Sequence, residues 1–139
     1  MTTHLILLPL LLQIALTLGL YIALTRAKAK ALTAGVVDEA RRALHDDAWP
    51  DSVLQINNCI RNQFEVPVLF YVLVLALLQL GAAGWLAQLL AWLFVLSRLA
   101  HALVHTGSNQ VPLRRRLFTL GCVLLMLMTA LLGWVVVVG

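Results

Sequence analysis

The chain has 139 residues, of which 62% are hydrophobic and only 12% are charged, and its formal net charge at pH 7 is +4. A soluble domain is about 45–50% apolar and about 25% charged, so this composition excludes a soluble globular domain, a disordered chain and a disulfide scaffold. What remains is an integral membrane protein with a single domain over residues 1–139, in which loop arginines and lysines indicate topology rather than nucleic-acid binding.

Four long apolar segments predict four membrane-spanning helices. Each segment can cross a hydrocarbon core of about 30 Å as a helix, and continuous runs of leucine, alanine and valine favour helices over a barrel. We therefore expect an all-α membrane protein, a four-transmembrane-helix bundle, with helices at about 5–25, 52–82, 84–106 and 112–138.

Single residues predict where these helices begin, bend and end. Asp51 follows a proline and is expected to cap the second helix. Pro67 is expected to kink that helix, because proline lacks the N–H that a helix interior requires. Gly107 is expected to end the third helix, and Pro112 to lie in the first turn of the fourth.

Apart from Arg98, lysine and arginine are confined to two loops, at 26–63 and 106–116, and the turn near Gly81 and both ends of the chain lack them. The positive-inside rule predicts that both loops are cytoplasmic and both termini are outside. No basic residue precedes the first apolar segment, so we expect a retained helix rather than a cleaved signal peptide.

Polar residues in apolar helices are costly and indicate function. Here they are concentrated where the second, third and fourth helices approach the basic loops. On one continuous second helix, Arg61, Asn62 and Glu65 would share a face, and spacings of three and four place Arg98, His101 and His105 on one stripe of the third. Arg114 lies in the first turn of the fourth helix, whose dipole favours anions. The pattern predicts a cationic pocket for a small anionic ligand.

Simpler interpretations remain open for several of these side chains. Arg61 would reach the interface by snorkelling, Glu65 would pair with Arg61 or Arg98, and His101 and His105 would serve helix packing. Arg115 and Arg116 are interpreted as topology determinants. His101, His105 and Glu65 have the spacing of metal ligands, but nearby arginines repel a cation, so no metal site is expected. Cys59 and Cys122 are isolated and are interpreted as apolar fillers.

Three stretches together resemble the MAPEG family, the membrane-associated proteins in eicosanoid and glutathione metabolism. They are RNQFEVP at 61–67, RLAHALVH at 98–105, and PLR at 112–114 followed by Phe118. The resemblance covers nearly the whole chain, although its specific motifs lie between about Asn58 and Phe118. The stretches NQFEVPVLFY and HTGSN are most similar to the short bacterial branch, which implies a bacterial inner membrane.

The resemblance implies a homotrimer that binds glutathione, as co-substrate, between neighbouring subunits. Residues matching the family pattern would bind glutathione, namely Arg26, Arg61, Asn62, Glu65, His101 and His105. Arg114 would be the catalytic residue that stabilises the thiolate, and Arg98 and Asn109 would belong to the polar pocket. The other partner would be an apolar small molecule or lipid from the bilayer.

The expected activity is that of a glutathione-dependent membrane transferase or peroxidase, acting on apolar electrophiles or lipid hydroperoxides. His105 and Phe118 stand where other family members carry tyrosines, so a specific eicosanoid synthase is not expected. Two alternatives remain at this point. One is a non-catalytic relative that binds another small anion or a lipid, and the other is a small four-helix transporter, although Glu65 lies near a helix end rather than at mid-membrane.

Overall fold

The computed structural model describes residues 3–139 and confirms an all-helical membrane architecture. Within these residues there is no β-strand, and four helical stretches are long and apolar enough to cross a membrane, at Thr3–Thr33, Asp51–Gln79, Trp85–Thr106 and Val111–Val138. The α-helices are α1 (Leu7–Thr33), α2 (Asp51–Gln63), α3 (Val66–Gln79), α4 (Trp85–Thr106) and α5 (Val111–Val138).

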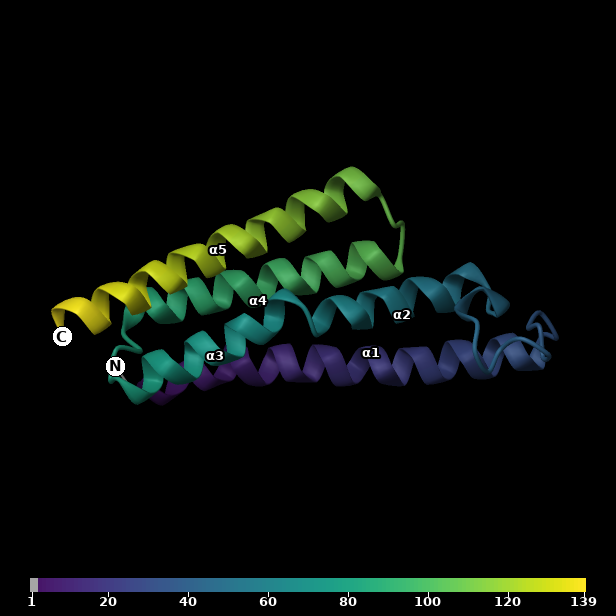
Figure 1. Ribbon diagram of the computed structural model, residues 1–139, viewed down its shortest axis with the longest axis horizontal. Coiled ribbons are helices and arrows are strands. Elements are labelled where there is room, and N and C mark those ends of the chain that lie inside the picture. The colour runs from purple at the N-terminus through teal and green to yellow at the C-terminus, as the bar shows by residue number, and fades with distance from the viewer. Residues whose placement is uncertain (1–2) are drawn as a thin grey trace.

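Helix α4 is the centre of the bundle. It packs most extensively against α5 and also contacts α1, α2 and α3. Figure 1 shows that the start of α1 and the end of α5 lie at the same end of the molecule. We call the opposite end, which carries loops 34–50 and 107–110, the basic end.

The core is built from the inward stripes of α3, α4 and α5. Phe70 of α3 stacks on Phe94 of α4, with ring centroids 4.6 Å apart, and both rings are fully buried. Leu124 and Met128 of α5 close the core from the other side of α4. Many large apolar side chains on the outward faces are exposed, which suits a surface covered by lipid.

The second membrane span is two helices rather than the one kinked helix that the sequence predicts. Helix α2 ends at Gln63 and α3 begins at Val66, and the intervening Glu65 has φ −96° and ψ −109°. Pro67 lies in the first turn of α3, where its missing N–H costs nothing. In a continuous helix, Pro67 could not donate to the carbonyl of Gln63, and its ring would clash with that carbonyl. The full break between α2 and α3 relieves this clash.

Other predicted boundaries shift by one residue or more. Pro50 is the capping residue of α2, so Asp51 is its first helical residue and makes no side-chain cap hydrogen bond. Helix α1 continues to Thr33, two turns beyond the predicted end. Gly107 does end α4, and Pro112 does lie in the first turn of α5, as predicted.

A glycine ends α3 before the turn into α4. Gly81 has φ +67°, and its N–H donates to the carbonyl of Leu78 while Ala82 donates to that of Leu77. This pair of bonds is a Schellman motif, which requires a left-handed residue and so favours glycine. The tight turn places α4 directly against α3 and fixes the direction in which α4 returns to the basic end.

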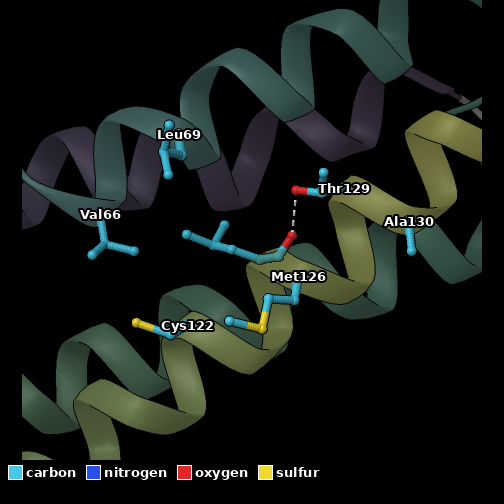
Figure 2. Close-up of a pocket in the computed structure, with 7 residues that line it drawn as sticks. Val66, Leu69, Cys122, Met126, Thr129 and Ala130 are labelled. Atoms are coloured by element: carbon cyan, nitrogen blue, oxygen red, sulfur yellow. Dashed lines mark hydrogen bonds between the residues drawn. The ribbon is translucent and has the colours of Figure 1, made fainter.

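An open apolar groove of about 520 Å³ lies between α3 and α5. Figure 2 shows Val66 and Leu69 on α3 facing Cys122 and Thr129 on α5. The Thr129 hydroxyl donates to the carbonyl of Leu125 at 2.8 Å. The groove therefore presents no unsatisfied hydroxyl to whatever occupies it.

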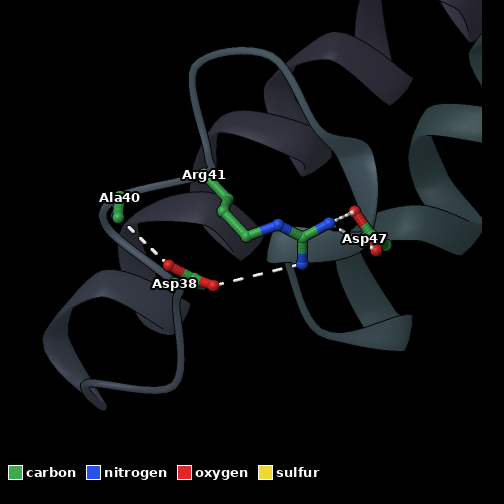
Figure 3. A network of polar contacts seen from close by, with 4 residues as sticks. All are labelled: Asp38, Ala40, Arg41 and Asp47. Carbon is green, nitrogen blue, oxygen red and sulfur yellow. Dashed lines mark hydrogen bonds and ion pairs between the residues drawn. The ribbon is translucent and has the colours of Figure 1, made fainter.

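Ion pairs hold the 34–50 loop at the basic end. The Arg41 guanidinium donates to both carboxylate oxygens of Asp47, at 3.0 and 2.9 Å, and reaches Asp38 at 4.0 Å (Figure 3). A carboxylate oxygen of Asp38 accepts the N–H of Ala40. These contacts neutralise part of the loop's charge, but all are exposed to solvent, so each contributes little to stability.

We expect the carboxyl of Asp47 to titrate below the ordinary aspartate pKa of about 3.9. The hydrogen bonds from Arg41 stabilise its carboxylate and lower the pKa of Asp47. Because the folded-state pKa is lowered, the ion pair stabilises the loop above the ordinary pKa, and that contribution is lost as pH falls through the lowered value. NMR titration of the carboxyl measures this midpoint. Arg41→Gln should return it to the ordinary value, and an unchanged midpoint would contradict the assignment.

Candidate functional site

A polar cavity of about 220 Å³ opens near the basic end, between α2, α4 and α5. Asn62 reaches it from the last turns of α2, His101 from α4, and Arg114 from the first turn of α5. The structure thus brings together one residue from each of the three groups that the sequence singled out. No acidic side chain lines this cavity, so its chemistry favours an anion.

Arg114 is positioned by the loop before its own helix. Its Nη1 donates to Oδ1 of Asn109 at 2.5 Å, and its backbone N–H donates to the carbonyl of Gln110. Asn109 has φ +51°, a left-handed conformation that asparagine tolerates better than most residues. Val111 begins α5 and also lines the cavity, so the positive end of the helix dipole adds to the Arg114 charge.

Behind the cavity, a buried polar stripe runs along α4. Arg98 is only 1% exposed, and its Nε and Nη2 have no hydrogen-bond partner among the described residues. His101 and His105 are also buried, with ring centroids 5.4 Å apart, and the Nδ1 atom of each likewise lacks a partner there. The predicted stripe therefore exists, and the unpaired guanidinium donors of Arg98 increase the positive character of the interior.

Phe118 lies between Arg98, a member of this stripe, and the cavity. Its ring lies 5.7 Å from Cζ of Arg98 and 6.1 Å from the ring of His101, and it also lines the cavity. The contact with Arg98 is within the range of a cation–π interaction, which partly compensates a buried charge. Phe118 thus forms the wall between a buried cation and the anion-favouring cavity.

Arg61 and Glu65 do not reach the cavity in this chain. Arg61 is exposed and forms an ion pair with Asp46 of the loop. Glu65 is exposed in the break between α2 and α3, so it shares no helix face with Arg61, and no ion pair to Arg61 or Arg98 forms among the described residues. Arg26, near the end of α1, is also exposed. These three charged side chains face outward.

Two amides anchor α2 beside the cavity. Gln13 of α1 donates from Nε2 to Oε1 of Gln63 at 2.8 Å, and Gln63 donates to the carbonyl of Cys59. Both glutamine side chains are almost completely buried. Because Gln63 follows Asn62, this bond fixes the end of α2 that presents Asn62 to the cavity.

Sequence reasoning did not assign Val111, Arg115 or Phe118 to the pocket. All three line the cavity. Their spacing of four and then three residues puts them on one face of α5, which is the signal that could have identified them. The sequence alone identifies Arg115 only as a topology determinant, because its neighbour Arg116 has the same character.

The cavity can hold a small anion and stabilise a developing negative charge. Guanidinium groups, an amide and a helix N-terminus supply donors in a partly desolvated site. Among residues 3–139, no group of three histidine, cysteine or acidic side chains gathers in a way that could hold a metal ion. The donor set is that of an anion site.

A comparison with protein families matches the chain to the model of the MAPEG family over residues 6–134, which is nearly the whole chain. Neither the curated proteins nor the solved structures contain a significant match to the sequence. The family match includes every residue that lines the polar cavity. With its four apolar spans and a match over almost its full length, the chain belongs to the MAPEG family.

Proposed function

We propose that this protein is a glutathione-dependent transferase or peroxidase that activates the glutathione thiol at Arg114. One observation carries the proposal. In a chain of this family, Arg114, His101 and Asn62 line one cavity at the positive end of α5. A thiolate bound there would face a guanidinium group and the helix dipole together.

The energy required is within reach of such a site. A free thiol has a pKa near 8.5, so at neutral pH it is mostly protonated and a poor nucleophile. Lowering that pKa by about two units needs about 2.7 kcal/mol of differential stabilisation. Charge-assisted hydrogen bonds contribute about 1.5–3 kcal/mol each, so Arg114 and the helix terminus together are sufficient.

A second copy of the chain would complete the binding site. The cavity of about 220 Å³ is smaller than the roughly 300–1,000 Å³ of typical ligand pockets, so it accommodates only part of a tripeptide. Arg26, Arg61 and Glu65 are exposed, and in a homotrimer they would be available to glutathione bound between subunits. Native mass spectrometry in detergent tests the trimer.

The proposed setting is a bacterial inner membrane, with both termini outside and the basic end in the cytoplasm. The charge distribution supports this orientation, because all lysines and arginines except the buried Arg98 lie near the basic end. In that orientation the polar cavity opens towards the compartment in which glutathione is abundant, and the apolar groove faces the bilayer.

Glutathione binding, measured by calorimetry, tests the proposal with a matched pair of variants. Arg115 lines the cavity and its neighbour Arg116 does not. Arg115→Ala should weaken binding about tenfold, which corresponds to about 1.4 kcal/mol, and Arg116→Ala should leave it unchanged. No saturable binding to the wild-type protein at millimolar glutathione would contradict the proposal. That result would favour a relative that binds another anion or a lipid.

A further inference from the structure

We propose that the cavity between the end of α1 and the start of α2 binds the headgroup of an acidic phospholipid, whose phosphate is held by Lys30 and Ser52. The cavity measures about 310 Å³, which is within the roughly 300–1,000 Å³ of typical ligand pockets. It shares no lining residue with the polar cavity at Arg114. Lipid binding here therefore requires neither glutathione nor the proposed function.

A projection made of two helices carries this cavity. Figure 1 shows that α1 and α2 extend further at the basic end than α4 and α5 do. The stretch Thr3–Thr33 has 31 residues and is about 46 Å long as a helix, whereas the hydrocarbon core is about 30 Å thick. About ten residues therefore lie outside the core. The change from apolar to basic sequence at Arg26 places them at the basic end.

The cavity lies at the level of the lipid headgroups. On α1 its lining begins at Ala27 and continues through Lys30 and Ala31 to Ala34. These residues lie about 3 to 14 Å beyond Thr25, the last residue of the apolar segment. The headgroup region of each leaflet is about 5–7 Å thick, so the cavity overlaps it. Side chains on a helix lean towards its N-terminus, which is the membrane side of this part of α1, so Lys30 leans back towards the headgroups.

The lining of the cavity combines a cationic rim with apolar walls. Lys30 and Ser52 are its polar residues, and both are exposed, while alanine, valine and proline form the rest. No acidic side chain lines it. The ammonium group and the hydroxyl donate hydrogen bonds, which phosphate oxygens accept. The apolar walls suit the glycerol and the first carbons of the acyl chains.

Lys30 has no carboxylate partner. It forms no ion pair among residues 3–139, whereas Arg41, Arg42 and Arg61 at the same end each have one. No aspartate or glutamate precedes Asp38 in the chain, so α1 itself carries no competing anion. An unpaired lysine near the membrane surface attracts anionic lipid, by about fivefold in affinity, which is equivalent to about 1 kcal/mol.

The walls of the cavity are tied together without a ligand. The ammonium of Lys28 lies 4.8 Å from the ring centroid of Trp49, a cation–π contact that fixes the residue before Pro50. The N–H of Val36 donates to the carbonyl of Ala31 at 3.3 Å. Because Pro50, Val36 and Ala31 all line the cavity, its shape is formed before a headgroup enters. A bound headgroup would join α1 to α2 and steady the 34–50 loop between them.

A matched pair of charge variants tests the role of Lys30. Native mass spectrometry of the delipidated protein in detergent measures its affinity for phosphatidylglycerol and for phosphatidylcholine with the same acyl chains. The wild type should bind one phosphatidylglycerol per chain about fivefold more tightly. Lys30→Gln should lose this preference, whereas Arg116→Gln, which removes an exposed cation outside the cavity, should keep it. Equal preferences in the two variants would overturn the proposal.

A second pair of variants tests the cavity itself without changing any charge. Ala34 and Ala29 are both exposed on α1, but only Ala34 lines the cavity. Ala34→Phe should fill the cavity and remove the preference for phosphatidylglycerol, and Ala29→Phe should not. If Ala34→Phe kept the wild-type preference, the lipid would be bound elsewhere and the assignment of this cavity would be wrong.

Two further measurements distinguish a bound lipid from a free ion. Millimolar inorganic phosphate should not displace phosphatidylglycerol, because a free ion does not use the apolar walls; displacement would overturn the proposal of a lipid. Hydrogen exchange of the 34–50 loop should be slower in phosphatidylglycerol nanodiscs than in phosphatidylcholine nanodiscs, and Ala34→Phe should abolish the difference. Equal exchange of the wild-type loop in both lipids would contradict the proposal. Glutathione is absent from all these measurements, so they leave the proposed function untouched.

Discussion

Arg114→Ala is expected to lower glutathione-dependent turnover at neutral pH by about tenfold to a hundredfold, because a charge-assisted hydrogen bond that contributes about 1.5–3 kcal/mol to thiolate stabilisation is lost. The variant removes a side chain that the loop before α5 positions by a hydrogen bond, from Nη1 to Oδ1 of Asn109. Rates measured against pH should show the variant recovering activity at higher pH, where free glutathione ionises near a pKa of about 8.5.

The control for this effect is the exposed Arg116, which lies outside the cavity. Arg116→Ala should retain wild-type turnover, and both variants should keep the wild-type oligomeric state. Arg114→Lys should keep part of the activity, because it retains a charge but loses the planar guanidinium. Normal turnover in Arg114→Ala at neutral pH would remove Arg114 from its proposed role.

Gly121→Leu is expected to destabilise the bundle by about 1–3 kcal/mol, because it overpacks the contact between α4 and α5. A Cβ at this position would lie 3.5 Å from Oγ of Ser97, 3.6 Å from Phe94 and 3.7 Å from Cδ of Arg98. These are ordinary contact distances, so Gly121→Ala should be tolerated. A leucine would push α5 away from Arg98 and carry Phe118 with it, so glutathione binding should weaken as well.

Gly133 provides a matched position on the same helix, since a Cβ there would have no neighbour within 4 Å. Gly133→Leu should leave both the thermal midpoint in detergent and glutathione binding close to wild type. If Gly121→Leu proved as stable as Gly133→Leu, the close packing of α5 on Arg98 would not hold.

The sequence was sufficient to predict the elements whose signals are local. Four long apolar segments could only be spans, and Gly107 and Pro112 mark their helix ends by intrinsic backbone preferences. The break before Pro67 could not be predicted, because a proline is compatible with either a kink or a full break. Packing against neighbouring helices decides between them, and periodicity carries no information on that packing.

The candidate site likewise has residues whose place could be predicted from the sequence and residues whose place could not. Asn62, His101 and Arg114 could be predicted to meet because each lies near the basic end of its span. Arg61 could not be placed, since its partner Asp46 lies 15 residues earlier in an irregular loop. Arg115 and Arg116 are adjacent arginines that the sequence cannot distinguish. Only the rotation of α5 on α4 decides which of them lines the cavity.

A thiolate titration tests the central claim most directly. Glutathione is added to the purified protein in detergent, and ultraviolet absorbance follows the thiolate near neutral pH in the wild type and in Arg114→Ala. The account predicts a signal that saturates with glutathione in the wild type and is absent in the variant. A wild-type protein that gives no thiolate signal at millimolar glutathione, or a variant that gives the full signal, would contradict it.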